Sequence, residues 1–383
     1  MLALYMLAKM IPDILFSAYG GILADNANRR VVMIVLEFFS IILSLAPVFI
    51  TTGSAIWILI VSTFLLTSAG SVFGPVKQTF IKEIASDLPA ANALMSSGSA
   101  ISMIVGSALG GVILLINTHV TFIINSATFA ISLIIIATIA IISPAKQLEN
   151  EADQQAASVI LNPVHTFRQI YEAFITITKT KSLFYRIWLG FGVSLAAGGI
   201  NVLLGAVAVT RLHSSPLNVG LVYASIGAGS LAGALVATRV MHSRMTYASI
   251  IGLATIFEGL FMGLFTQSAI VYLSLPLLFI GGVFSSIEDA TTDTLIMEDT
   301  PDEMLGRFYS VYETTTTIGF ALSTLLIGLL ATYSVPVSGV IITAIWILSG
   351  VLWLVFTTGK NNKQSQQSLS KTDTVDMVTI PNE

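Results

Sequence analysis

The sequence predicts an all-α membrane protein built from two helical bundles. Hydrophobic residues make up 55% of the 383 residues, charged residues only 10%, and the mean hydropathy is +0.87. A soluble domain carries about 25% charged residues. Long apolar runs recur along the chain, and each approaches the roughly 20 residues that a membrane-spanning helix needs. The alternating pattern of a membrane barrel is absent, so helices remain as the way to satisfy backbone groups in lipid.

Eleven apolar runs are predicted to span the membrane, five before a long polar break at 144–182 and six after it. The runs cover residues 1–22, 31–51, 55–80, 93–116, 119–142, 184–210, 217–240, 246–266, 269–292, 308–332 and 336–357. The first five give an N-terminal bundle within 1–143, and the last six give a C-terminal bundle within 183–358. The break ends in a segment with apolar residues at helical spacing, 162–181, which predicts an amphipathic helix on the membrane surface. The polar residues 359–383 predict a disordered tail.

Orientation follows from the basic residues, which fall in every second loop. One set of alternate loops, together with the C-terminal tail, holds the basic residues: Arg29 and Arg30, Lys82, those of the break at 144–182, Arg239 and Arg244, Arg307, and the tail lysines. The intervening loops hold only Arg211. Basic loops stay in the cytoplasm. The sequence therefore predicts a multi-pass protein of a bacterial inner or cell membrane, with the break and the C-terminus inside and Met1 outside.

Several functions are excluded by what the sequence lacks. The chain contains no cysteine, which removes disulfide and thiol chemistry, and its net charge of −4 gives no argument for nucleic acid. The four histidines fall in or beside loops on opposite sides of the membrane, so they cannot form one metal site. No nucleophile triad or phosphate-binding loop is visible. The sequence thus predicts neither an enzyme nor a cofactor site.

The break between the first two runs carries an unusual motif, YGGILADNANRR at 19–30. Gly21, Asp25, Arg29 and Arg30 resemble the loop pattern G-x-x-x-D-x-x-x-R-R/K of the major facilitator superfamily, although Asn28 replaces a usual glycine. Two further stretches, FGPVKQTFIKEIASDLPAANAL (73–94) and TPDEMLGRFYSV (300–311), resemble its macrolide-efflux and enterobactin-exporter branch. The resemblance extends over nearly the whole chain and implies two pseudo-symmetric six-helix bundles.

This motif suggests a latch between the bundles. Gly21 lacks a side chain, so another helix can approach closely, and Asp25 can accept hydrogen bonds from a helix N-terminus of the other half. The resemblance implies that this helix begins near Gly306 and Arg307. Arg29 and Arg30 are expected to pair with carboxylates such as Glu83. Such a latch would hold the cytoplasmic gate shut in one state and break in the other.

A weak repeat relates the two halves and suggests that a span precedes Met1. Gly21 corresponds to Gly233 at an offset of 212 residues, and Asn92 corresponds to Gly306 at an offset of 214. Ala237 stands where the second half would carry the latch acid. Parallel repeats are typical of transporters, and this offset makes residues 1–22 the second span of its half. We therefore expect about 35–45 upstream residues, counting a span of about 20 residues plus a short tail and loop.

Glycines cluster in the fourth run, in GSAISMIVGSALGG at 98–111. Gly98, Gly106, Gly110 and Gly111 resemble an exporter antiporter motif, with Ser107 in place of its proline. Plain helix packing explains small residues equally well. In contrast, GAGSLAG at 227–233 follows no strand, so it is expected to pack helices and not to bind a nucleotide.

Acids within the spans are candidates for proton coupling, because an unpaired acid in lipid favours its protonated form. Glu258 stands in mid-span without a local cation, and Glu37 lies one to two turns into its run. Asp13 can pair with Lys9 on one helix face. Glu288 and Asp289 lie toward the cytoplasmic end of their run, where water is an alternative partner.

A cavity for a hydrophobic compound is expected to combine aromatic residues with a few polar groups. The resemblance places seven candidates on the fourth, seventh and tenth helices of the family: Phe73, Gln78, Trp188, Phe191, Asn201, Phe284 and Thr291. Each has an alternative role in lipid contact or packing.

Together these features predict a secondary active exporter that works by rocking-bundle alternating access and is driven by proton influx. The expected partners are the bilayer, protons and a small hydrophobic compound such as a macrolide, and the protein is expected to act as a monomer. A siderophore is the alternative substrate. An uptake carrier and a truncated, non-transporting membrane protein are the other hypotheses.

Overall fold

The computed structural model describes residues 2–49, 56–116, 118–139, 175, 181–210 and 216–376. The described chain is helical. Its α-helices are α1 (Leu2–Asn26), α2 (Arg29–Leu45), α3 (Ile56–Ile84), α4 (Leu88–Ile116), α5 (Thr118–Thr138), α8 (Lys181–Thr210), α9 (Pro216–Met241), α10 (Tyr247–Gln267), α11 (Val271–Asp299), α12 (Leu305–Tyr333) and α13 (Val335–Asp376). Short 3-10 turns, η1 (Ala46–Phe49) and η4 (Asp302–Met304), follow α2 and precede α12.

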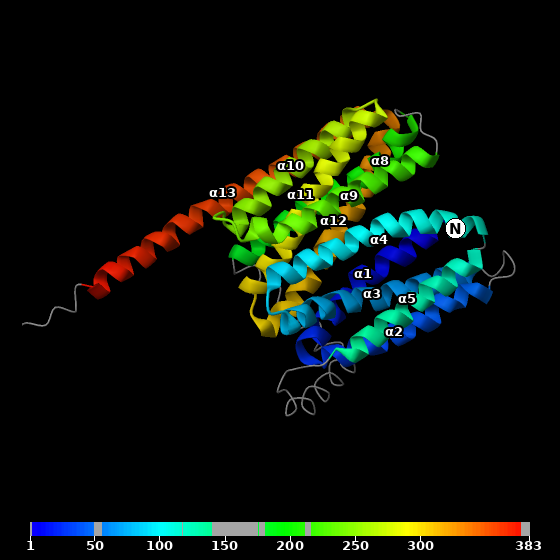
Figure 1. Ribbon diagram of the computed structural model, residues 1–383, viewed down its shortest axis with the longest axis horizontal. Coiled ribbons are helices and arrows are strands. Elements are labelled where there is room, and N and C mark those ends of the chain that lie inside the picture. The colour runs from blue at the N-terminus through cyan, green and yellow to red at the C-terminus, as the bar shows by residue number, and fades with distance from the viewer. Residues whose placement is uncertain are drawn as a thin grey trace, which may run out of the picture.

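The helices form two bundles, as predicted (Figure 1). α1 to α5 make the first bundle, in which α1 packs on α3 and α2 packs on α5. α8 to α13 make the second, in which α9 packs on α11, α8 on α12 and α10 on α13. The bundles meet where α1 contacts α12 and where α4 contacts α9 and α11. Ten helices in the part of the chain that is described, α2 onward, are long and apolar enough to cross a membrane.

Local sequence sets the ends of several helices at the loops that join them. Asn28 caps α2 by accepting a hydrogen bond from the Val31 N–H at 3.2 Å. Asp87 accepts one from the Ala90 N–H at 3.0 Å at the start of α4, and Thr246 caps α10. Such caps satisfy N–H groups that the first helical turn leaves unpaired. Polar capping residues therefore mark where α2, α4 and α10 begin.

Glycines bring helices of the second bundle into backbone contact. A Cβ at Gly229 or Gly233 of α9 would overlap the carbonyl oxygen of Phe279 or Val283 on α11. Small residues permit this close crossing, which favours helix association in membranes. The helix-packing interpretation of residues 227–233 is confirmed.

The glycines of α4 behave differently, which corrects the sequence interpretation. Gly98 and Gly106 are exposed, and a Cβ at either would meet no atom within 4 Å. They do not pack helices here, because α4 turns other residues, such as Ala93 and Ala100, toward its neighbours. The side-chain surroundings of Gly110 and Gly111 lie outside the described residues.

The second half of the chain also ends differently from the prediction. α13 continues to Asp376, whereas disorder was predicted from residue 359. Extending an existing helix is much easier than nucleating a new one, and neither glycine nor proline occurs between Asn361 and Asp376. The predicted amphipathic helix at 162–181 lies outside the described residues apart from residues 175 and 181.

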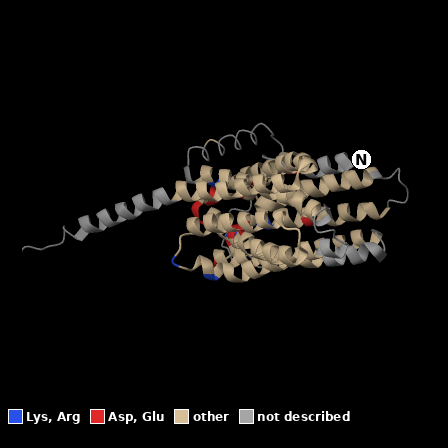
Figure 2. Cartoon of the chain, turned by 90° about the horizontal axis from the view of Figure 1, so that it is seen from above, with Lys and Arg blue, Asp and Glu red and all other residues tan. Residues whose placement is uncertain are grey.

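Charged residues gather toward the end of the helices from which α13 extends (Figure 2). We call this the gate end; it includes Asp25, Arg29, Lys82 and Arg307. The sequence predicts that it faces the cytoplasm. The chain has no cysteine, so single cysteines can test this.

We expect Ser243→Cys, exposed at the gate end, to resist an impermeant maleimide added to intact cells. Ala269→Cys, exposed in the loop between α10 and α11, should react with the same reagent. Permeabilised cells provide the control, because both positions should then react. The reverse labelling pattern would show that the predicted orientation is wrong.

Candidate functional site

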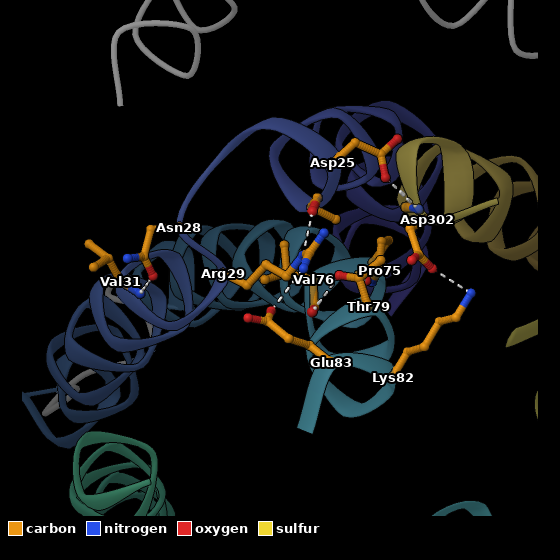
Figure 3. Close-up of polar contacts among 12 residues, drawn as sticks. Asp25, Asn28, Arg29, Val31, Pro75, Val76, Thr79, Lys82, Glu83 and Asp302 are labelled. Atoms are coloured by element: carbon orange, nitrogen blue, oxygen red, sulfur yellow. Dashed lines mark hydrogen bonds and ion pairs between the residues drawn. The ribbon is translucent and has the colours of Figure 1, made fainter. Parts of the chain in front are cut away.

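Asp25 joins the two bundles at the gate end (Figure 3). It lies in the last turn of α1, and its carboxylate accepts hydrogen bonds from the Gly306 and Arg307 N–H groups at 2.7 and 3.2 Å. The Arg307 Nε–H donates to the same carboxylate at 2.8 Å. Those N–H groups belong to the first turn of α12, where unpaired donors and the helix dipole favour an anion. The expected contact is therefore present, and its role in gating stays a prediction.

Two glycines allow α1 and α12 to approach this closely. A Cβ at Gly21 would overlap Ser310 Oγ, and it would lie 2.6 Å from the Gly306 oxygen and 2.9 Å from Arg307 Cα. A Cβ at Gly306 would lie 2.5 Å from the Gly21 oxygen and 2.7 Å from an Asp25 carboxylate oxygen. Deeper along the same contact, the Ser17 hydroxyl donates to the Ser310 carbonyl at 2.9 Å. Any side chain at either glycine would separate the helices.

The two arginines of the motif stay within the first bundle and have different partners. Arg29 pairs with Glu83 at 2.8 Å, as expected, and also donates to the Ala24 carbonyl at 2.8 Å. Arg30 donates to the carbonyl oxygens of Ile136 and Ala137 instead of pairing with Glu83. These carbonyls lie at the C-terminus of α5, where a positive charge is favourable. Arg29 therefore links α1, α2 and α3, while Arg30 anchors α5.

Further contacts cross between the bundles near the gate end. Lys82 donates to the Thr300 carbonyl at 3.0 Å and pairs with Asp302 at 2.6 Å, and Figure 3 shows the latter pair beside the start of α12. The Asn92 side-chain amide donates to Thr294 Oγ1 at 3.1 Å. Several polar contacts thus join one bundle to the other at the gate end.

The equivalent contact in the second half is apolar. Ala237 of α9, which corresponds to Asp25, is fully buried and packs in a cluster with Ala93 of α4 and Met241. Ala93 directly follows Asn92, which corresponds to Gly306. In the described structure, one of the two related interfaces is therefore held by a charge at a helix end, whereas at Ala237 the other is apolar and its nearby polar contact comes from the uncharged amide of Asn92.

A cavity of about 330 Å³ lies between the bundles. Its walls come from α3 and α4 of the first bundle and from α9, α11 and α12 of the second. Its polar lining residues are Lys77, Gln78, Ser96, Ser99, Ser230, Ser286, Asp289, Thr292, Asp293 and Tyr312. A volume of this size falls at the lower end of small-molecule sites, about 300–1,000 Å³. The sequence suggested aromatic residues with a few polar groups, whereas most of the lining residues are polar and Tyr312 is the aromatic residue among them.

Sequence reasoning overlooked most of the charged residues in and beside this cavity. The Gln78 amide donates to Asp293 at 3.4 Å, and the Tyr309 hydroxyl donates to the same carboxylate at 3.3 Å. Lys77 interacts electrostatically with Asp293 and with Glu313, whose carboxylate packs against Gly74. The signal that could have identified these residues is the presence of a lysine or an acid within an apolar run.

Three of the five predicted coupling acids lie near one another in the second bundle. Glu258 of α10 is buried and interacts electrostatically with Glu288 and Asp289 of α11. Glu288 accepts a hydrogen bond from Thr292 at 2.8 Å, while Asp289 is exposed to the cavity. In the described structure, Glu258 Oε2 has no hydrogen-bond partner. Like charges at such proximity disfavour simultaneous ionisation.

The other two acids lie in the first bundle, apart from this group. Glu37 of α2 is buried and accepts a hydrogen bond from Ser132 of α5 at 2.7 Å. Asp13 of α1 accepts one from Ser71 of α3 at 2.5 Å. The side chain of Lys9 lies outside the described residues, so the expected pair with Asp13 has no structural account.

Of the seven predicted cavity residues, Gln78 lines the cavity and the others do not. Trp188 is 57% exposed and contacts Phe191 edge to face, and Asn201 is also exposed. Thr291 is fully buried and donates to the Ile287 carbonyl. These positions do not line the cavity in this conformation, because helix number alone does not say which face of a helix turns toward it.

The remaining two predicted cavity aromatics pack inside the bundles. Phe73 packs on the apolar cluster around Val76 and Phe80. Phe284 stacks on Phe257 and Phe261 of α10. Both are therefore packing residues in this structure.

Known proteins resemble this chain in sequence. The family model of the Major Facilitator Superfamily matches residues 1–324 and 191–376. The enterobactin exporter EntS of Citrobacter koseri is 26% identical over 196 residues, which cover 51% of this chain and 46% of that protein. The putative bacilysin exporter BacE of Bacillus subtilis is 22% identical over 331 residues, 84% of this chain and 78% of that protein. The match to the enterobactin exporter thus spans about half of its length.

Solved transporters share the fold. The fucose:proton symporter FucP of Escherichia coli superposes with a TM-score of 0.72 at 11% identity, covering 93% of this chain and 90% of its own. The human organic anion transporter MFSD10 superposes with a TM-score of 0.73 at 12% identity, covering 91% and 83%. At these identities the likeness establishes the two-bundle architecture and no substrate.

Proposed function

Because the chain belongs to the Major Facilitator Superfamily, we propose that it is a transporter that exports a small organic molecule by alternating access. The observation that carries this proposal is Asp25 at the start of α12, where one carboxylate joins the two bundles. The relatives named above as exporters support the outward direction. The gate end is closed in this conformation and would open in the other.

Breaking the latch would release the bundles from each other. An anion at a helix N-terminus is worth about 0.3–2 kcal/mol, depending on burial, and such an energy is comparable to the difference between two transport states. The contact is therefore strong enough to bias the closed state and weak enough to be broken in each cycle. The polar contacts of Lys82 would break at the same step.

The substrate proposal changes in the light of the cavity. The sequence favoured a hydrophobic, macrolide-like compound, but serines, threonine, acids and a lysine form much of the cavity wall. A polar compound can satisfy these groups, whereas an apolar one would leave them unpaired. A siderophore is the second candidate, supported by the similarity to enterobactin exporters.

Everted membrane vesicles test the proposed export. Vesicles that contain the protein should accumulate an exported compound when a proton gradient is imposed, and a protonophore should abolish the accumulation. Erythromycin and enterobactin serve as the macrolide and siderophore probes, together with the dipeptide alanyl-alanine as a small polar probe. Vesicles without the protein are the control. If none of the three accumulates above this control, the export proposal fails.

Proton coupling is proposed to reside in the acids shared by α10 and α11. We expect Glu258→Gln to abolish the dependence of substrate exchange on external pH, because the amide mimics a permanently protonated acid. Exchange would be measured between pH 5.5 and 8.5 in proteoliposomes without a gradient. Glu37→Gln is the matched control, since Glu37 pairs with Ser132 away from the cavity. Full pH dependence in Glu258→Gln would leave that acid a structural role only.

A further inference from the structure

The central cavity presents charges of both signs from opposite bundles. Lys77 reaches it from α3, and Asp289 reaches it from α11. Within the described part of the chain, neither residue forms an ion pair. The two charges therefore face a shared space without neutralising each other by direct contact.

The other charged groups nearby already have protein neighbours. Asp293 accepts hydrogen bonds from Tyr309 and Gln78. The carboxylate of Glu313 packs against Gly74 of the first bundle. Both acids attract Lys77 electrostatically without forming an ion pair with it among the described residues. Asp289 also contacts a neighbouring acid, Glu288, but of the two acids that line the cavity it is the more exposed and has no cation partner among the described residues.

Two uncharged groups in the cavity wall also lack partners. Gln78 Oε1 and Ser286 Oγ are buried and have no hydrogen-bond partner among the residues that the structure describes. Buried polar atoms are normally paired with protein, water or ligand. One of these atoms lies on each bundle, on the same helices as Lys77 and Asp289.

We propose that this cavity binds a small zwitterion, a molecule with a protonated amine and an anionic group, as the exported substrate. The amine pairs with Asp289 and can donate to Gln78 Oε1 or Ser286 Oγ, and the anionic group pairs with Lys77. Because the two anchors belong to different bundles, a bound molecule connects α3 to α11. A molecule that lacks the amine leaves Asp289 unpaired, and one that lacks the anionic group leaves Lys77 unpaired. Either molecule should therefore bind less tightly than the zwitterion. This inference rests on the proposed export function and names its substrate class.

Four dipeptide probes separate the two charges. They are alanyl-alanine, its N-acetyl derivative, its C-terminal amide and the doubly blocked neutral compound. Binding to the full chain in lipid nanodiscs would be followed as a rise in thermal unfolding temperature, read from intrinsic tryptophan fluorescence. We expect alanyl-alanine to bind at least about tenfold more tightly than any blocked form, because each blocked form loses at least one ion pair. A tenfold loss of affinity corresponds to about 1.4 kcal/mol of binding free energy.

Two variants assign the anchors. In Lys77→Met, alanyl-alanine and its amide should bind equally, because the anionic group has lost its partner. In Asp289→Asn, alanyl-alanine and its N-acetyl derivative should bind equally. Arg244→Met, which removes an exposed loop charge, should preserve the full preference for the zwitterion. Variants that merely unfold would lower the unfolding temperature without changing the ranking of the probes.

Equal binding of all four probes, or binding of none, would overturn the zwitterion site. The vesicle assay distinguishes this from a failure of the proposed export. Accumulation of enterobactin or erythromycin without dipeptide binding would reject the zwitterion and leave the exporter. Dipeptide binding without accumulation of any compound would keep the site and reject export.

Discussion

Asp25→Asn is expected to lower the transport rate about fivefold to thirtyfold while leaving the amount of folded protein in the membrane unchanged. The amide keeps the size of the side chain but loses the charge that faces the first turn of α12 and Arg307. In partly buried geometry such a helix-end interaction is worth about 1–2 kcal/mol, which shifts a two-state balance by this factor. The closed gate should therefore become less populated.

A substrate-independent measurement can check the same variant. Spin labels on Ser86→Cys of the first bundle and Ser243→Cys of the second are both exposed at the gate end. Double electron–electron resonance should show a larger population of long distances between the two spin labels in Asp25→Asn than in the protein without this substitution. Glu303→Gln is the matched control, since it removes an exposed acid whose side chain does not bridge the bundles in the described structure. Identical distance distributions in all three proteins would remove the latch from the mechanism.

Gly21→Ala is expected to lower transport strongly, because its methyl group would fall where the two bundles meet. The new Cβ would lie 2.6 Å from the Gly306 carbonyl oxygen and 2.9 Å from Arg307 Cα. Both are backbone atoms, so α1 and α12 must separate instead of rearranging one side chain. Overpacking typically costs about 1–3 kcal/mol, which corresponds to about a fivefold to 150-fold loss of the closed state. Transport should fall accordingly.

Gly70→Ala provides the matched control for this methyl group. Gly70 lies on α3, and an added Cβ there would meet no atom within 4 Å. The substitution should leave transport and the spin-label distances unchanged, because alanine also favours a helix more than glycine does. If Gly21→Ala transports as well as Gly70→Ala, then the close approach of α1 and α12 is not required for the cycle. Such a result would argue that the bundles meet differently in the working protein.

The sequence alone determined the architecture of this protein. Apolar runs of span length have few alternatives in lipid, because every backbone group must be paired within a helix. The motif around Asp25 was equally readable, since a helix N-terminus attracts an anion wherever it lies. Its resemblance to the family pattern then pointed to the helix near Arg307 as the partner of Asp25, and the two are in contact.

Only the tertiary structure decided which side chains share the cavity. A helical run shows that Phe284 and Asp289 lie within a few turns of each other, but rotation about the helix axis sends the first into packing and the second to the cavity. Lys77 and Asp289 are far apart in sequence and carry no periodic signal that links them. Hydrophobic matching fixes the depth of a helix in the membrane, whereas its rotation depends on contacts with neighbouring helices. The latch could thus be found from local chemistry, while the charged cavity required the two bundles to be placed against each other.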